Sequence, residues 1–464
     1  VAHISVLKEL ERLQVPIDCV AGTSMGSLIG GLYASGMTPA ELEEMVTTID
    51  WMELMDDGIM RQDRSFRRKL DDQKALAPAR PGVGKSGLKL PAGVKTGEKI
   101  LMFLENKTGK AAGVPDFNLL SIPYRAVATD INTGKAVVIG SGNLATAMRA
   151  SMAIPGAFTP VDIDGKLLVD GGMVNQVPVD VVRAMGADIV IAVDVGTPLG
   201  EIDSTTNLLK IADQVIGFLT VGNTEDTIAA LRKQDILIRP ELGSEVSTTS
   251  FEKEKIELAL KIGSEAAASA SPRFAALSAP SVPARIAPLN RDAETIIAFI
   301  DIDNQTIYNY GIFDSILAPL KGKPIDRREI EKLFAEIYGQ YPLDALTYRV
   351  EHRNGETGLA VQVKPKAIGR TLGEFAMDFS SNQDSQTQFN LTFGLLWSPV
   401  NSNGGEMRGL LTVGDEPGLV GEWYQPLTPG GKYFSNLGAG YQQDLYQFGD
   451  GLDSVVAEYI RNEF

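Results

Sequence analysis

The chain has 464 residues, of which 44% are hydrophobic and 22% are charged. These fractions lie near the averages of globular proteins, so disordered, collagen-like and low-complexity classes are excluded. The 43 basic and 59 acidic residues leave a net charge of −16, which argues against a whole surface built to bind nucleic acid. One cysteine, Cys19, and two histidines cannot form a usual structural zinc site. We therefore expect no metal, no cofactor and no nucleic-acid partner.

The chain starts at Val1, and no charged segment followed by an apolar run precedes the first predicted helix. We therefore expect no targeting peptide within it. No apolar run reaches the roughly 18 residues that a membrane-spanning helix requires. Localisation must be argued from other features.

Up to about residue 200, short apolar strands alternate with helical stretches, which is typical of an α/β fold with a parallel sheet. Residues 207–271 are predicted to be helical up to Pro272, and the proline-rich residues 276–290 are predicted to be a linker. The elements expected before residue 200 are helix 4–13, strand 17–21, helix 24–34, strand 124–129, helix 144–152, helix 179–185 and strand 189–194.

After the linker the pattern changes. From residue 371 onward helical signals nearly vanish, and strands of alternating character dominate. Phe389, Phe393 and Trp397 fall on one face of a predicted strand, and Asn390 and Thr392 fall on the other, which indicates an antiparallel, barrel-like segment. Between the linker and this segment we expect strand 295–302, helices 314–320 and 327–338, and a hairpin of strands 346–352 and 358–364 around Asn354-Gly355.

Gly22-Thr23-Ser24-Met25-Gly26 matches the pattern G-x-S-x-G between a predicted strand and a predicted helix. In this context the pattern is typical of a strained turn that exposes a serine nucleophile. Gly22 and Gly26 allow the turn, and the helix N-terminus favours developing negative charge. The alternative is a glycine-rich turn in which Ser24 only caps the helix.

A serine nucleophile needs a base, and neither histidine fits a Ser-His-Asp triad. His3 starts the first helix, and His352 lies beyond the linker. Asp170 is the best candidate, because a short strand leads into Asp170-Gly171-Gly172, where two glycines let the chain turn and expose the carboxylate to a neighbour. Such a base acts through proximity and partial desolvation. Asp-Gly-Gly alone is also compatible with an ordinary turn.

Four blocks resemble the patatin-like phospholipases: A-H-I-S-V-L at 2–7, G-T-S-M-G at 22–26, R-A-S-M-A-I-P-G-A-F-T-P at 149–160 and D-G-G at 170–172. The resemblance implies a three-layer α/β hydrolase that cleaves acyl esters of lipids with a Ser-Asp dyad, in which Ser24 is the nucleophile and Asp170 the base. In that family a Gly-rich loop that supplies oxyanion-hole amides precedes the position matching Val1, so we expect this chain to be a fragment of a longer gene product. The amide of Met25 is a further oxyanion candidate.

Residues 291–366 resemble a POTRA domain, and the strands after them resemble the start of an outer-membrane barrel of the surface-antigen family, most of all at 421–427. This layout is similar to that of type V autotransporters of subclass d in Gram-negative bacteria. It implies an outer-membrane protein with a periplasmic POTRA domain and a surface-exposed or secreted hydrolase. The predicted domains are hydrolase 1–275, linker 276–290, POTRA-like domain 291–366 and a partial barrel 367–464, too short to close.

Residues 61–99 carry eleven basic and four acidic residues. We interpret them as a mobile flap over the site that meets anionic lipid headgroups; a solvated loop is the alternative. Residues 79–86 match a relaxed phosphate-loop pattern, but prolines replace the strand and the helix that such a loop requires.

The predicted function is phospholipase A-like hydrolysis through an acyl-enzyme at Ser24. The implied partners are a phospholipid substrate and a membrane, and a homodimer is compatible with the sequence. Two alternatives stay open for the whole chain: a catalytically silent passenger or outer-membrane assembly module, and a general soluble esterase. A small soluble β-domain is the alternative to the partial barrel.

Overall fold

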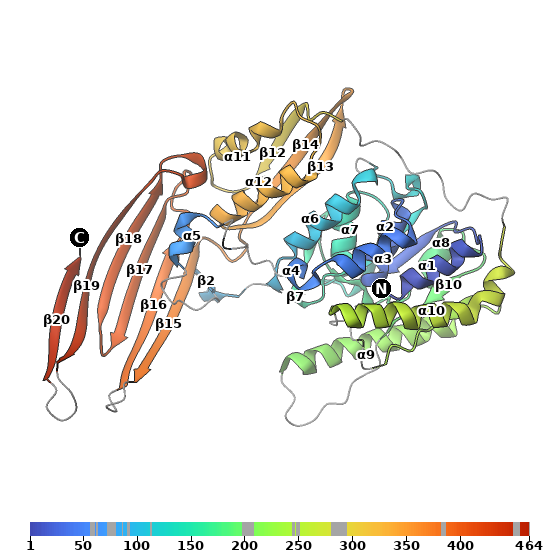
Figure 1. Cartoon of the computed structure of the whole chain (residues 1–464), viewed down its shortest axis with the longest axis horizontal. Coiled ribbons are helices and arrows are strands. Elements are labelled where there is room, and N and C mark those ends of the chain that lie inside the picture. The colour runs from blue at the N-terminus through green and yellow to red at the C-terminus, as the bar shows by residue number, and fades with distance from the viewer. Residues whose placement is uncertain are drawn as a thin grey trace. The chain divides into compact units, whose positions relative to one another are not determined.

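The computed structural model describes residues 1–55, 61, 64–71, 80–85, 87–90, 93–111, 114–196, 208–243, 246, 251–279, 295–381, 387–448 and 455–463. The chain divides into two units, whose elements are labelled in Figure 1. Unit 1 contains Val1–Asp57 and Ala92–Ala293, and unit 2 contains Gly58–Pro91 and Glu294–Phe464. The predicted hydrolase domain 1–275 is therefore interrupted, because residues 58–91 group with unit 2. The predicted linker lies outside the described residues from 280 onward.

Unit 1 contains helices on a mixed sheet. Its helices are α1 (His3–Arg12), α2 (Met25–Ala34), α3 (Pro39–Thr48), α4 (Trp51–Met55), α6 (Glu98–Lys107), α7 (Leu144–Ser151), α8 (Val179–Ala184), α9 (Leu208–Ala229) and α10 (Lys253–Ala275). Its strands are β1 (Val20–Thr23), β4 (Gly93–Lys95), β5 (Tyr124–Asp130), β6 (Lys135–Ile139), β7 (Gly156–Phe158), β8 (Val161–Ile163), β9 (Lys166–Asp170), β10 (Ile191–Val193) and β11 (Ile236–Ile238).

Two strands meet end to end beside β5. The last residue of β1, Thr23, pairs with Val127, and the last residue of β9, Asp170, pairs with Ala128. Strand β6 pairs with both of these β5 residues. Because each edge of a strand accepts one partner at a given residue, β1 and β9 must share the opposite edge of β5. The chain therefore leaves β1 at the point where β9 ends.

The sheet of unit 1 is mixed, so the prediction of a parallel sheet is wrong for several strands. β1 and β5 are parallel, whereas β6 and β9 run antiparallel to β5, and β8 runs antiparallel to β9. For β8 and β9 the cause is the length of the connection. The turn at Asp164-Gly165, with φ of 52° and 76°, joins β8 directly to β9, and such a short connection allows only antiparallel pairing.

Helices α2 and α7 pack on β5, and their apolar side chains form the main core of unit 1 with Tyr124, Ala126 and Ala128, which alternate along one face of that strand. Their burial fixes the position of the two helices whose ends flank the β1–β5–β9 junction. The predicted helices 4–13, 24–34, 144–152 and 179–185 are confirmed as α1, α2, α7 and α8, to within two residues at each end.

The part of unit 2 that follows the predicted linker begins with the predicted β-α-α-β-β order, which is confirmed. Its small sheet has the order β12-β14-β13, with β12 parallel to β14. The predicted hairpin turn is present, with positive φ at Asn354 and Gly355. The elements are β12 (Phe299–Asn304), α11 (Tyr310–Leu317), α12 (Arg327–Gln340), β13 (Leu343–Arg353) and β14 (Glu356–Pro365).

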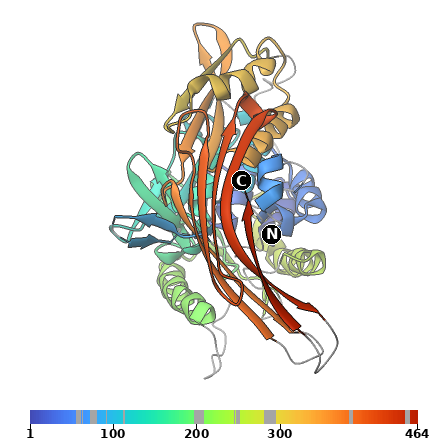
Figure 2. The ribbon, with the colours of Figure 1, turned by 90° about the vertical axis from the view of Figure 1, so that its left-hand side faces the viewer.

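The predicted antiparallel strands are also present, and they form one long curved sheet with the order β20-β19-β18-β17-β16-β15-β2-β3 (Figure 2). Within the described strands, β20 and β3 are its two ends and do not pair with each other. The sheet consists of β2 (Gly82–Gly84), β3 (Gly87–Lys89), β15 (Thr371–Ser381), β16 (Thr387–Trp397), β17 (Glu406–Gly414), β18 (Gly418–Pro426), β19 (Phe434–Phe448) and β20 (Val455–Glu463).

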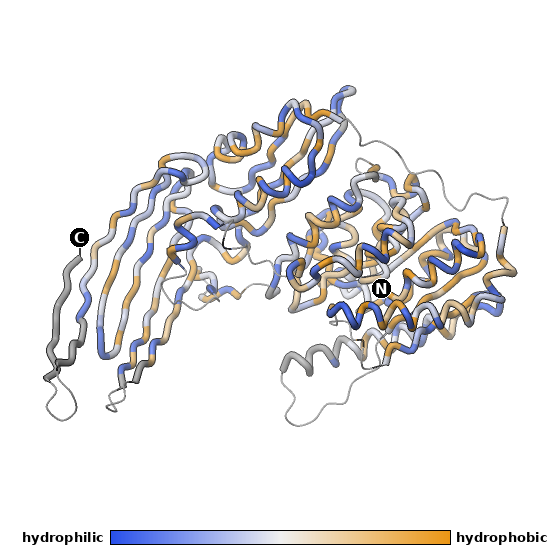
Figure 3. Tube along the Cα trace, in the orientation of Figure 1, coloured by the Kyte–Doolittle hydropathy of each residue, from blue (hydrophilic) through white to orange (hydrophobic). Residues whose placement is uncertain are grey.

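Hydrophilic and hydrophobic residues are interspersed along its strands (Figure 3). The strand register puts a set of large apolar side chains on one face, and we call this the apolar face. The exposed members of the apolar face are Phe375, Met377, Phe379, Phe389, Phe393, Leu395, Trp397, Met407, Leu411, Val413, Leu419, Trp423, Leu437 and Tyr441. The other, polar face carries four buried or nearly buried charged side chains, Glu374, Glu406, Arg408 and Glu422.

The strap, which we define as residues 64–71, 80–85 and 87–90, packs on the polar face. It contains helix α5 (Phe66–Asp71). Arg67 donates to both carboxylate oxygens of Glu422, at 2.8 and 3.1 Å, and Arg68 pairs with Glu406. The strap also adds β2 to the sheet beside β15. It therefore belongs to the structure of unit 2.

A second set of ion pairs connects Asp71 of the strap to the strands. Arg408 donates to Asp71 at 2.7 Å and to both oxygens of Glu374, at 2.9 and 3.2 Å. Burial alone raises the pKa of Asp71, but the hydrogen bond and the charge of Arg408 leave that pKa below its usual value. The buried charge of Asp71 thus depends on an arginine from the strands.

These contacts revise the interpretation of the basic stretch 61–99. Arg67 and Arg68 are paired within unit 2, and Arg80 lies within 3.4 Å of Glu374. Residues 64–90 belong to unit 2 and not to the unit that contains Ser24. Arg67, Arg68 and Arg80 are therefore engaged by carboxylates of unit 2 and are not free to bind lipid headgroups.

We expect Arg408→Met to destabilise unit 2 by about 3–5 kcal/mol, because it leaves Asp71 and Glu374 buried without their main partner. Arg349→Met is the matched control, since Arg349 is 63% exposed and pairs with Glu351 at the surface, where such pairs contribute about 0–1 kcal/mol. Chemical denaturation of both variants measures the difference. Equal losses of unfolding free energy would contradict the assigned role of the buried network.

Candidate active site

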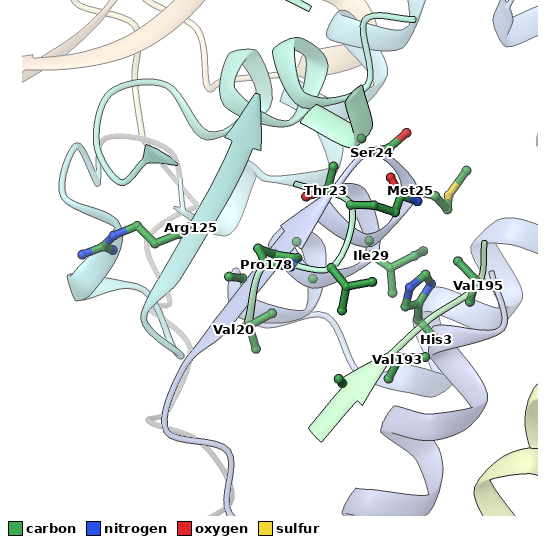
Figure 4. Close-up of a pocket in the computed structure, with 18 of the residues that line it drawn as sticks. His3, Val20, Thr23, Ser24, Met25, Ile29, Arg125, Pro178, Val193 and Val195 are labelled. Carbon is green, nitrogen blue, oxygen red and sulfur yellow. The ribbon is translucent and has the colours of Figure 1, made fainter. Parts of the chain in front are cut away.

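Ser24 lies at the junction of β1 and α2 with φ of 53° and ψ of −123°, a backbone conformation that is strained for a residue with a side chain. Its backbone N–H donates to Ser151 Oγ at 3.0 Å, and its carbonyl accepts from Leu28 N–H at 3.1 Å. The strain lifts the Ser24 side chain out of the turn. Figure 4 shows this side chain at the end of β1, projecting away from the strand.

Gly22 and Gly26 have different roles in this turn. A Cβ on Gly22 would lie 2.3 Å from the carbonyl oxygen of Gly26, so only glycine fits there. A Cβ on Gly26 would lie 3.5 Å from His3 Nε2, which is an ordinary contact. The tight turn therefore requires Gly22 and tolerates a larger residue at 26.

Ser151 supports the turn from α7. It is fully buried, and its hydroxyl donates to the carbonyl of Val127 at 2.6 Å while accepting the N–H of Ser24. It thereby ties the turn to the β5 residue that pairs with Thr23. Sequence reasoning quoted Ser151 within the block 149–160 but gave it no role, because a hydrogen bond across 127 residues leaves no periodic signal.

The structure brings Asp170 to Ser24, because β1 and β9 lie on the same edge of β5 and their C-terminal ends meet there. The Ser24 side chain lies close enough to the Asp170 carboxylate to favour its charged form, and Gly172 N–H donates to Asp170 Oδ1 at 2.8 Å. Burial raises the pKa of Asp170 to about 6, against the opposing effects of Ser24 and of the Gly172 N–H. A carboxylate with this pKa accepts a proton more readily than an exposed aspartate.

Both glycines of the Asp-Gly-Gly motif lie in close approaches. A Cβ on Gly171 would lie 2.2 Å from the Val127 carbonyl oxygen, and one on Gly172 would lie 2.3 Å from Gln176 Oε1. Gly171 and Gly172 begin the short helix η5 (Gly171–Met173), which directs the chain away from β5 directly after Asp170. The motif is therefore more than an ordinary surface turn.

His3 also lines the cavity around Ser24, but it does not complete a triad. Burial lowers its pKa to about 3, and its Nδ1 has no hydrogen-bond partner. In Figure 4 its ring lies toward Val193 and Val195, while the Ser24 side chain projects in the opposite direction. His352 belongs to β13 of unit 2.

A cavity of about 1870 Å³ opens beside Ser24 and Asp170. It extends between β1 and β10, and its lining is mostly apolar, with Met25, Arg125 and Lys95 also at its wall. A space of this composition suits a substrate with long hydrocarbon chains. The apolar side chains that line it include Met52, Met55, Ile154, Phe158, Val179 and Phe251.

Neither a metal site nor a membrane helix occurs in the parts of the chain that the structure describes. No group of three or more His, Cys, Asp or Glu residues there is arranged to hold a metal ion. Within the same residues, no helix has the length and apolar character needed to span a bilayer.

We expect Gly22→Ala to destabilise unit 1 by about 1–3 kcal/mol, because its methyl group would overlap the Gly26 carbonyl. Gly26→Ala is expected to be neutral or stabilising by up to about 1 kcal/mol, since it adds a good helix former to α2. Thermal unfolding of the two variants measures the contrast. The described geometry of the turn would be refuted if both substitutions had the same effect.

Part of this chain is similar in sequence to known proteins. Residues 1–183 match the family model of the patatin-like phospholipases. An uncharacterized NTE family protein of Mycobacterium tuberculosis is 35% identical over 192 residues, 41% of this chain and 44% of that protein. Patatin-like phospholipase domain-containing protein 6 of Homo sapiens is 32% identical over 219 residues, 47% of this chain and 14% of that protein. The chain thus spans less than half the length of these relatives. Residues 1–183 are a patatin-like phospholipase domain.

Proposed function

We propose that the protein hydrolyses acyl esters of phospholipids through a Ser24-Asp170 dyad. The meeting of the ends of β1 and β9 on one edge of β5, which brings the Ser24 side chain close to the buried Asp170 carboxylate, is the observation that carries this proposal. It places a nucleophile beside a base within an apolar cavity. The match of residues 1–183 to the patatin-like phospholipases supports the substrate class.

The residues provide a complete proton path for this reaction. Ser24 Oγ attacks the ester carbonyl while its proton passes to Asp170, and the carbonyl oxygen becomes an oxyanion. Asp170 then returns the proton to the departing lysophospholipid alcohol, which leaves an acyl-enzyme. Water attacks the acyl-enzyme as Asp170 takes its proton. Asp170 then gives this proton to Ser24 Oγ as the bond between Oγ and the acyl carbon breaks, which releases the fatty acid and regenerates Ser24.

The oxyanion requires hydrogen-bond donors. Met25 is the first residue of α2 and lines the cavity next to Ser24. Its N–H lies at the helix N-terminus, where backbone donors and the helix dipole favour negative charge. We assign this N–H as one donor of the oxyanion hole.

The silent-passenger hypothesis accounts less well for the site. A buried carboxylate whose pKa is raised to about 6 costs folding free energy at neutral pH, and a backbone strained at Ser24 costs more. Such features are concentrated at functional sites. A general soluble esterase would not need so large an apolar cavity.

We expect Ser24→Ala and Asp170→Asn each to lower kcat of phospholipid hydrolysis at least about a thousandfold, because each removes one half of the dyad. In the active protein kcat/KM should rise with pH up to about 6 and then level off, since Asp170 acts only when deprotonated. Fatty-acid release from phosphatidylcholine vesicles, measured on protein from the complete reading frame, provides the test. Unchanged turnover in folded Ser24→Ala would exclude the dyad.

For unit 2 we propose attachment to the outer membrane of a Gram-negative bacterium, with the β-α-α-β-β segment acting as a periplasmic POTRA domain. The specific observation is the exposed apolar face, which is continuous across β15 to β19 while the charged residues lie on the opposite face. A soluble sheet normally has the reverse arrangement. Strands of nine to eleven residues also match the thickness of a bilayer. In this proposal the hydrolase is surface-exposed or secreted, as in an autotransporter; a homodimer stays a prediction.

We expect the double variant Phe393→Asp and Leu411→Asp to reduce the membrane-bound fraction of the protein severalfold, because this cross-strand pair lies on the apolar face. The matched control is Thr392→Asp with Thr412→Asp, the adjacent pair on the polar face. Cell fractionation followed by detergent extraction measures both. Equal loss from the membrane in the two double variants would contradict the assigned lipid-facing side.

A further inference from the structure

Asn223 of α9 contacts the chain directly after Asp170 from a distant part of the sequence. Its side-chain Nδ2 donates to the Gly172 carbonyl at 2.9 Å, and its Oδ1 accepts from Gln176 N–H at 2.9 Å. One amide thus bridges two backbone groups four residues apart. Asn223 is 53 residues from Asp170, and nothing in the sequence pattern of α9 distinguishes it.

The bridged segment determines the position of the Asp170 carboxylate. The N–H of Gly172, whose carbonyl accepts from Asn223, donates to Asp170 Oδ1 at 2.8 Å. At its other end the segment receives a hydrogen bond from Thr23 Oγ1 to the Asn175 carbonyl, at 2.7 Å. The segment from 170 to 176 is therefore fixed on one side by β1 and on the other by α9.

We propose that Asn223 is a positioning residue for Asp170, and that the hydrolysis proposed above depends on its side-chain amide. This inference rests on the proposed function. Asn223 does not touch the reacting atoms in this assignment. It binds the carbonyl of Gly172 and thereby holds in place the residue whose N–H donates to the Asp170 carboxylate.

The chemistry of the amide suits this role. The bridge needs one donor, for the Gly172 carbonyl, and one acceptor, for the Gln176 N–H, and an uncharged amide supplies both. Without the bridge, Gly172 is held less firmly, and the hydrogen bond from its N–H that favours the charged form of Asp170 is weakened. Its proton affinity then rises, and its distance from Ser24 varies.

The same helix also borders the cavity. Gln214, Gly217 and Thr220 of α9 line the space beside Ser24. One further contact of Asn223, from Nδ2 to the Leu219 carbonyl at 2.7 Å, orients the amide within its own helix. Helix α9 therefore lines the cavity and also holds the segment that positions Asp170.

The test compares Asn223→Leu, which is neutral and similar in size but has no hydrogen-bonding groups, with Thr227→Val. Thr227 lies one turn further along α9, and its hydroxyl donates only to the helix carbonyl of Asn223, at 3.0 Å. We expect Asn223→Leu to lower kcat about tenfold to a hundredfold with little change in KM. The acidic limb of its kcat/KM profile should move to higher pH. Thr227→Val should retain the kcat and the pH profile of the unmodified protein.

Thermal unfolding of each variant first establishes that it is folded. If Asn223→Leu is folded and retains both kcat and the acidic limb, the inference is overturned while the dyad stands. A fall in kcat with an unmoved acidic limb, or an equal fall in Thr227→Val, also overturns it, since either would reflect a general effect on α9. Absence of Ser24-dependent turnover in the unmodified protein removes the proposed function and this inference with it.

Discussion

The end-to-end meeting of β1 and β9 on one edge of β5 is the constraint on which the site depends. It requires β1 to stop at Thr23, and the chain then has no continuation within the sheet. The strained conformation of Ser24 is the consequence, and the buried hydroxyl of Ser151 holds the backbone in it. Because β9 ends at the same point, Asp170 lies beside Ser24, although 146 residues separate them in the sequence. Packing of α2 and α7 on β5 stabilises the whole arrangement.

Unit 2 follows a different physical rule. Its long sheet has its charges on the covered face and its large apolar side chains on the exposed face. The strap stabilises the covered face, because each buried carboxylate there needs an arginine as partner. Arg67 and Arg68 of the strap pair with Glu422 and Glu406. The strap is inserted between α4 and β4 of unit 1, so a segment that interrupts the hydrolase sequence is part of the fold of the second unit.

The sequence predicted the features that local patterns encode. The strand-turn-helix context of Ser24 and the two glycines after Asp170 identified both residues, and alternating hydrophobicity identified the antiparallel strands and the β-α-α-β-β order. The antiparallel course of β6, β8 and β9 was missed, because short turns such as Asp164-Gly165 were not weighed against the general α/β alternation. The roles of Asn223 and of the Arg408 network were not predictable, since their partners are distant in sequence. A run of basic residues gives the same sequence pattern whether its side chains are solvated or buried against carboxylates.

Covalent labelling of Ser24 with a fluorophosphonate ester, followed by mass spectrometry of the digested protein, tests the central claim most directly. The account predicts a single phosphonylated serine, Ser24, with labelling that slows markedly in Asp170→Asn at pH 7 and remains unchanged in Thr227→Val. Labelling at another serine, or labelling of Ser24 at the same rate in folded Asp170→Asn, would contradict the assignment of Ser24 as a nucleophile activated by Asp170.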